Sequence, residues 1–103
     1  MATLWEKVYQ NVPIATYVAV SGTYAILATD WMVNCTSGTF TVTLLTAVGR
    51  AGQIFTIKNS GTGTITIATT SSQTIDGGAS ASIILNQYQA LSVMSDGANW
   101  IIT

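Results

Sequence analysis

Charged residues are scarce in this chain. Seven of its 103 residues are Asp, Glu, Lys or Arg, whereas a globular chain of this length has about 26. The mean hydropathy is +0.46, so the polar surface comes mainly from Thr, Ser, Asn and Gln. Such a surface repels other copies of itself only weakly. The scarcity of charge favours a chain that buries much of its surface against other copies over a threonine-rich monomer.

The chain also lacks histidine. Histidine is the commonest general base and metal ligand, so its absence removes the usual basis of acid–base catalysis and of a metal centre. The four acidic residues, Glu6, Asp30, Asp76 and Asp96, lie 20 or more residues apart. Asp76 and Asp96 each precede glycine, where a carboxylate usually accepts hydrogen bonds from the backbone that follows it. We therefore predict no enzyme, no catalytic residue, no metal and no cofactor.

A single cysteine and three basic residues exclude further classes of function. Cys35 has no partner for an internal disulfide and no histidine to activate it as a nucleophile, so we interpret it as a buried strand residue. Three scattered basic residues do not make the positive patch that nucleic-acid binding needs. The longest uncharged stretch, residues 8–29, is interrupted by polar residues, glycine and proline, so membrane insertion is not expected.

What the chain does contain is alternation of apolar and polar residues from residue 14 onward. In residues 39–44 (TFTVTL), Phe40, Val42 and Leu44 point one way and three threonines the other. This pattern is typical of a half-buried strand with a threonine outer face. It predicts about eight to ten short strands, placed at 14–20, 23–28, 31–35, 39–44, 53–58, 64–68, 82–85, 90–94 and 99–103.

Glycine-containing turns separate these strands. Residues 36–38 and 59–63 are each expected to join their flanking strands as a hairpin. Turn signals about every 8–12 residues are typical of a sandwich or barrel. The predicted fold is all-β, an antiparallel β-sandwich or jelly-roll-like single domain over residues 14–103. We find no internal repeat that would predict a solenoid.

The first 13 residues differ from the rest of the chain. They carry a weak helix-capping signal and apolar residues one helical turn apart, and Pro13 would end a helix there. Isolated helices this short are marginal in water. We therefore expect residues 1–13 to be a short helix or an arm that docks on a neighbouring copy or on another protein through Trp5, Val8 and Tyr9.

Four positions break the alternation within the strands. Leu45, Ile84, Met94 and Ile101 each follow or adjoin another apolar residue, so one member of each pair must face away from the local core. A strand covered on both sides explains any single case, but a second apolar face packed against a neighbouring subunit explains all four. The predicted self-association residues are Trp5, Val8, Tyr9, Leu45, Ile84, Met94 and Ile101.

Aromatic residues next to polar ones suggest a second kind of surface. A Trp beside Asn or Thr on an exposed face can stack on a sugar ring, which makes Trp31, Asn99 and Trp100 candidate glycan contacts. Packing is the favoured role of Trp100, because two isoleucines follow it directly.

Four segments carry a resemblance to a known family. They are residues 23–44, 52–67 (GQIFTIKNSGTGTITI), 71–80 (SSQTIDGGAS) and 87–102 (QYQALSVMSDGANWII). In this order they resemble a β-rich domain of tail-fibre and other virion proteins of tailed bacteriophages, which is also present in related bacterial surface proteins. The resemblance covers about four-fifths of the chain and rests on the order of the segments, since each alone is low in complexity.

The resemblance implies an all-β module of a trimeric fibre or similar virion appendage, without catalytic residues. Three positions depart from the family pattern: Leu45 stands where proline is usual, Ile84 where threonine is usual, and Met94 where a polar residue is common. These departures predict more extensive self-association than in a typical member.

The expected function is that of a virion structural protein, located in the virion or outside the cell. It would self-assemble, as a homotrimer in the first instance, contact other virion proteins and contribute to attachment to the host surface. The alternatives are a carbohydrate-binding or adhesin module that recognises a cell-surface glycan, and a subunit of a filament or coat. An enzyme such as a depolymerase is the least favoured alternative.

Overall fold

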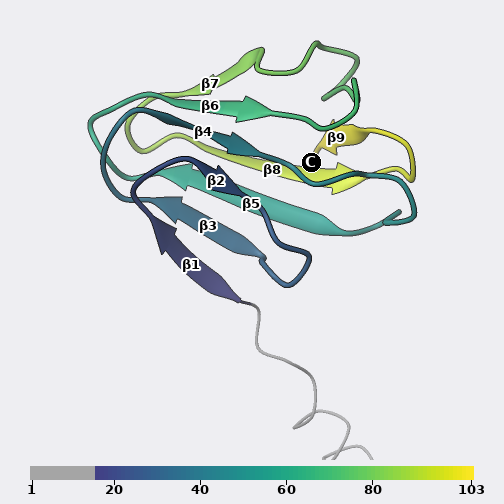
Figure 1. Ribbon diagram of the computed structural model, residues 1–103, viewed down its shortest axis with the longest axis horizontal. Coiled ribbons are helices and arrows are strands. Elements are labelled where there is room, and N and C mark those ends of the chain that lie inside the picture. The colour runs from purple at the N-terminus through teal and green to yellow at the C-terminus, as the bar shows by residue number, and fades with distance from the viewer. Residues whose placement is uncertain (1–15) are drawn as a thin grey trace, which may run out of the picture.

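The computed structural model describes residues 16–103, which form nine strands and no helix. One sheet contains, in spatial order, β1 (Tyr17–Val20), β3 (Met32–Cys35), β5 (Ile54–Asn59), β8 (Ala90–Ser95) and β9 (Trp100–Ile102). The other contains β2 (Tyr24–Ala25), β4 (Phe40–Thr43), β6 (Ile65–Ala68) and β7 (Ile83–Leu85), and Figure 1 shows both. The all-β class and nine strand positions are confirmed within the described residues. The arm at 1–13, with Trp5, Val8 and Tyr9, lies outside them.

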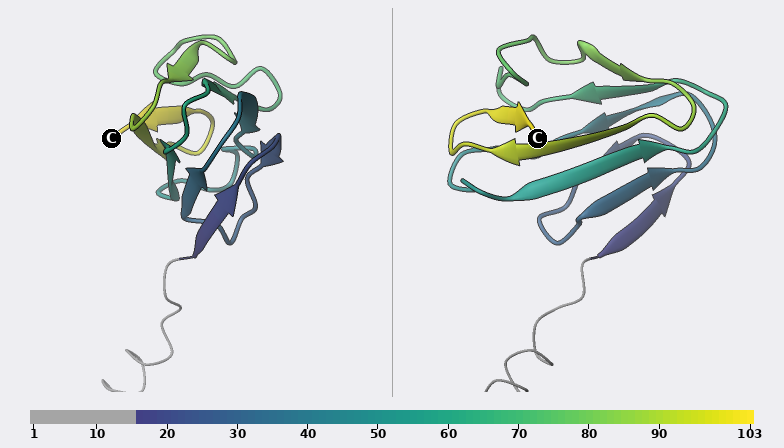
Figure 2. Two further views of the ribbon diagram at one scale, coloured as in Figure 1. Left: turned by 90° about the vertical axis from the view of Figure 1, so that its left-hand side faces the viewer. Right: turned by 180° about the vertical axis from the view of Figure 1, so that it is seen from behind.

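The first six strands alternate between the two sheets. β1 pairs with β3 and β3 with β5, while β2 pairs with β4 and β4 with β6, and all four pairings are parallel. The chain therefore advances as stacked turns that pass from one sheet to the other (Figures 1 and 2). β7, β8 and β9 then pair antiparallel. The antiparallel, jelly-roll-like arrangement that we predicted was wrong, because both sheets are mixed.

The stacked turns differ in length, which explains why no repeat is visible in the sequence. In the five-stranded sheet Tyr17 is paired with Met32, and Met32 with Thr56. The first step spans 15 residues and the second 24. A solenoid is recognised from a constant period, so this coil of unequal turns gives no such signal.

The turns at 36–38 and 59–63 do not form the predicted hairpins. Each connects a strand of one sheet to a strand of the other, so the two turns stack on each other instead. A Cβ atom on Gly63 would lie 2.2 Å from the carbonyl oxygen of Gly38. The glycine at this position is therefore required by the close approach of two backbones, and a local turn signal cannot distinguish this use from a hairpin.

A buried asparagine fixes the same turn. Asn59 is fully buried at the end of β5. Its Nδ2 donates to the carbonyl oxygens of Gly63 at 2.8 Å and Leu85 at 2.9 Å, and its Oδ1 accepts from the Gly61 amide at 3.0 Å. All its side-chain polar atoms thus have partners, as burial of an amide requires.

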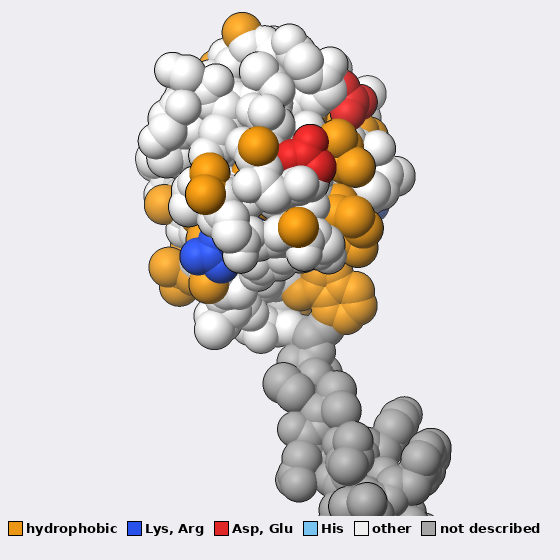
Figure 3. All heavy atoms as spheres, turned by 90° about the vertical axis from the view of Figure 1, so that its right-hand side faces the viewer, with side chains coloured by type: hydrophobic (Ala, Val, Ile, Leu, Met, Phe, Trp, Pro, Cys, Tyr) orange, Lys and Arg blue, Asp and Glu red, His pale blue; other side chains and the backbone are white. Residues whose placement is uncertain are grey.

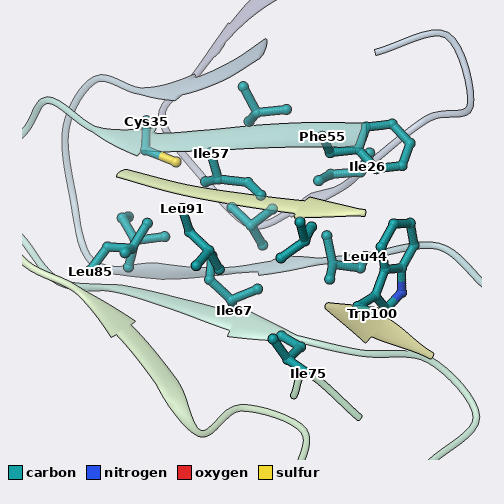
Figure 4. Close-up of a cluster of buried hydrophobic side chains, with 14 of the residues drawn as sticks. Ile26, Cys35, Leu44, Phe55, Ile57, Ile67, Ile75, Leu85, Leu91 and Trp100 are labelled. Atoms are coloured by element: carbon teal, nitrogen blue, oxygen red, sulfur yellow. The ribbon is translucent and has the colours of Figure 1, made fainter. Parts of the chain in front are cut away.

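One hydrophobic core lies between the two sheets. Alternate residues of β3, β5, β8 and β9 fill it from one side, and those of β4, β6 and β7 from the other (Figure 4). The rings of Phe55 and Trp100 pack at a centroid distance of 5.6 Å and an interplanar angle of 57°, a favourable tilted arrangement. Two facing sheets around one core make this part of the chain a sandwich-like unit.

Candidate self-association surface

The outer face of the five-stranded sheet carries an apolar row made of Ile54, Met94 and Ile101. Backbone pairing sets these residues side by side on three adjacent strands, since Ile54 is opposite Met94 and Met94 is opposite Ile101. The neighbouring residues Phe55, Val93, Ser95 and Trp100 are buried, so the row points away from the core. Ile54 is 37% and Ile101 38% exposed, and Met94 is half-buried. Met94 and Ile101 were predicted; Ile54 was missed, although it too adjoins an apolar residue, Phe55.

A polar network occupies the same face beside β1. The Tyr17 hydroxyl accepts from Nδ2 of Asn34 at 3.1 Å, and the Ser60 hydroxyl donates to Oδ1 of Asn34 at 2.6 Å. Tyr17 is 60% exposed, so its ring is a large apolar surface held in place by a hydrogen bond at its tip. The outer face therefore combines apolar side chains with amide and hydroxyl groups.

The four-stranded sheet presents threonines outward. Thr41, Thr66 and Ile84 lie in one row across β4, β6 and β7. Ile84 is 46% exposed, while its neighbour Ile83 packs against the core. Leu45 is partly buried and also packs against the core, so it offers little surface to a partner.

The three candidate glycan contacts are not brought together as a sugar site. Trp100 is fully buried, so the prediction of a sugar contact there is contradicted, and its favoured packing role is confirmed. Asn99 is half-buried, and its Oδ1 accepts from the Thr74 amide at 2.9 Å. Trp31 is 50% exposed. An exposed Tyr88, 68% accessible, was not singled out, since a tyrosine in a polar turn has no distinctive pattern.

The acidic residues serve local structure. The Asp96 carboxylate accepts from the amides of Asn99 and Ala98, which lowers its pKa and confirms the predicted turn role. Asp76 behaves differently from the prediction: its Oδ1 accepts from the Ile102 amide at 3.0 Å, far along the chain. Buried Asp30 accepts from the Tyr24 hydroxyl at 2.5 Å and the Leu27 amide at 2.9 Å.

Burial is the main cause of the raised pKa values of Tyr24 and Cys35. Removal from water raises the pKa of Tyr24 to about 12, with a further contribution from Asp30, and raises that of Cys35 to about 11. A buried thiol of this kind stays protonated near neutral pH and is not a nucleophile. Within residues 16–103, no three Cys, Asp or Glu side chains come close enough to hold a metal ion.

Comparison with known proteins found no match. This holds for family models, for curated proteins and for solved structures alike. The described residues also include no helix long and apolar enough to span a membrane. The surface itself is therefore the main guide to function. On the face drawn in Figure 3, hydrophobic side chains are scattered among polar atoms and few charged groups are visible.

Proposed function

We propose that this chain is a self-assembling structural subunit, of the kind found in phage tail fibres and other virion appendages, and that it forms a homotrimer. Its role is mechanical: copies pack together through surfaces that each would otherwise expose to water. In the virion it contacts other structural proteins and contributes to attachment to the host surface.

The apolar row supports this proposal most directly. Ile54, Met94 and Ile101 lie side by side on an outer face, where an antiparallel or mixed sheet exposed to water normally carries polar residues. Aligned apolar side chains on a surface are characteristic of contact with another protein. The low charge of the chain adds to this argument, because the approach of two copies meets little electrostatic resistance.

The resemblance of residues 23–44, 52–67, 71–80 and 87–102 to tail-fibre domains supports the virion setting. It is also the basis for the trimer, which is the usual symmetry of such fibres. Met94, one of the departures from that family pattern, belongs to the apolar row. The row is therefore a feature through which this chain would associate more extensively than its counterparts.

Two variants on one face of one strand test the proposal. Met94→Asp puts a charge in the apolar row, and the control Ser92→Asp puts the same charge two residues away on the same face of β8. By light scattering, we expect Met94→Asp to shift the trimer toward monomer and Ser92→Asp to shift it much less. Because apolar contacts dominate, the wild-type assembly should change little with added salt. A wild-type chain that is monomeric at all concentrations would refute the proposal.

The exposed Trp31 favours glycan binding as a second candidate function. Half of this residue is accessible to solvent, and an exposed indole can stack on a sugar ring. A glycan array followed by Trp31→Ala tests this candidate, with Tyr88→Ala as an exposed aromatic control. Loss of binding in the first variant alone, with folding retained, would support it, and binding unaffected by Trp31→Ala would exclude this residue.

A further inference from the structure

The two edges of the five-stranded sheet are closed to different degrees. At one edge, β9 is covered by residues 74–76. The Trp100 amide donates to the Thr74 carbonyl oxygen at 2.9 Å, and the Asp76 amide donates to the Trp100 carbonyl oxygen at 3.0 Å. The Asp76 carboxylate accepts from the Ile102 amide at 3.0 Å. The backbone of β9 therefore has hydrogen-bond partners on both sides, with a charged group among them, and a further strand cannot add there.

The opposite edge of that sheet, β1, is open within the described residues. β1 pairs with β3 on one side and ends the sheet on the other. The Thr16 carbonyl oxygen accepts from the Met32 amide of β3. The Val20 carbonyl oxygen accepts from the amide of Thr36, the residue that follows β3. Because backbone groups alternate in direction along a strand, the N–H and C=O groups of Tyr17 and Ala19 point to the free side. They can pair with one more strand.

The four-stranded sheet also ends in an unguarded strand, β7, at the opposite end of the molecule from β1 (Figures 1 and 2). Natural edge strands are usually protected from pairing by charged residues or proline. Neither β1 (YVAV) nor β7 (IIL) contains either, and β7 carries the exposed Ile84. β2, which also ends a sheet, is two residues long and offers too little backbone for stable pairing.

We propose that the free edge of β1 pairs with the free edge of β7 from a second copy of this chain. This inference rests on the proposed trimer, because a closed ring of three copies needs two different patches on each copy that fit one another. β1 and β7 are such a pair: each is an apolar edge, and they lie at opposite ends of the stack. The same contact without ring closure would give a filament.

Two sets of variants test the two edges separately. Ala19→Pro removes an N–H on the free side of β1, and Ala19→Glu puts a charge on this strand. The control is Ala90→Glu, because Ala90 lies in the same outward row (Ala19, Asn34, Lys58, Ala90) but on the inner strand β8. At β7, Ile84→Lys is matched by Thr66→Lys, its neighbour on the inner strand β6.

The dissociation constant of the trimer is measured by sedimentation equilibrium. We expect both Ala19 variants and Ile84→Lys to raise it by about tenfold or more. Each control should change it by less than about threefold. A wild-type trimer that both edge sets leave intact would overturn the edge pairing while leaving the proposed self-assembly standing. Loss of association in the Ala19 variants alone would overturn it too, since this result means that β1 meets some other strand. A monomeric wild type would instead refute the proposed function itself.

Amide hydrogen exchange distinguishes a second copy from the chain's own first 15 residues as the occupant of the β1 edge. If a second copy pairs there, the amides of Tyr17 and Ala19 are protected in the assembly and lose protection when it is diluted to monomers. The Val18 amide, which alternation directs toward β3, stays protected throughout. Protection of Tyr17 and Ala19 that does not depend on concentration would overturn the inference.

Discussion

Strands β5, β8 and β9 have two apolar sides with different surroundings. Toward the core they present Phe55, Val93 and Trp100, which are fully buried. Toward the outside they present the apolar row of Ile54, Met94 and Ile101. Both sides are built from similar side chains, yet the inner one stabilises a single chain and the outer one gains from burial only when another copy covers it. The difference separates residues that fold the chain from residues that assemble it.

The largest effect is expected on the inner side. Trp100→Ala removes a fully buried ring that packs against Phe55. Chemical denaturation should show a loss of about 3–5 kcal/mol in the free energy of unfolding. The control Trp31→Ala, at a half-exposed ring, should change it by about 0.5 kcal/mol or less. Equal losses in the two variants would contradict the placement of Trp100 in the core.

A smaller loss of folding stability is expected from removing the buried amide of Asn59, at the end of β5. Asn59→Ala leaves the Gly61 amide and the carbonyls of Gly63 and Leu85 without their side-chain partner. Denaturation should show a loss of about 2–3 kcal/mol, because buried groups without partners are costly. Asn34→Ala, in the exposed network of the outer face, should cost under about 1 kcal/mol. A reversed order would mean that the stacked turns do not depend on Asn59.

Alkaline pH should lower the free energy of unfolding through Tyr24, a residue of β2 that packs against the same core. The pKa of its hydroxyl is raised from 10.0 to about 12 by burial and by Asp30. The unfolded chain loses this proton at lower pH than the folded chain, so the contribution is complete below pH 10 and is lost as the pH rises toward 12. Cys35, whose pKa is raised to about 11, acts in the same direction.

Measuring the free energy of unfolding across this pH range in the wild type and in Tyr24→Phe isolates the tyrosine. The variant should show a shallower decline, because the Cys35 contribution remains while the Tyr24 contribution is gone. Identical slopes in the two proteins would show that Tyr24 ionises equally easily in the folded and unfolded states.

The smallest effect on folding is expected on the outer side. Ile54→Thr shortens the apolar row by one member but leaves the inner side of β5 unchanged. The dissociated chain should unfold with a change of under about 0.5 kcal/mol. The dissociation constant of the assembly should rise by about three- to tenfold, measured by light scattering across a dilution series. A large loss of folding stability would place Ile54 in the core and remove the contrast between the two sides.

The sequence predicts the strands of this chain better than their connections. Alternation in segments such as 39–44 locates β4 because inner and outer residues differ chemically. Whether the next strand joins the same sheet depends on contacts between distant turns, such as Gly63 against Gly38, and these leave no local pattern. The hairpin and antiparallel predictions failed for that reason.

The candidate surface was also predicted only in part, because the sequence pattern marks single residues and not their neighbours in space. Adjacent apolar residues correctly marked Ile84, Met94 and Ile101 as positions with an outward apolar side chain. The alignment of Met94 with Ile54 and Ile101 depends on strand register, which the sequence does not state. The role of Asp76 at the edge of β9 likewise depends on a contact between residues 26 positions apart. Patterns identify unusual residues, and the fold determines which of them meet.

Sedimentation equilibrium of the unaltered 103-residue chain in dilute, physiological buffer tests the central claim most directly. The account predicts a species of about 32 kDa, three times the chain mass of 10.8 kDa, that persists when salt is added. A stable species of 10.8 kDa under the same conditions would contradict it, because the outer row and both open edges would then be satisfied by water alone.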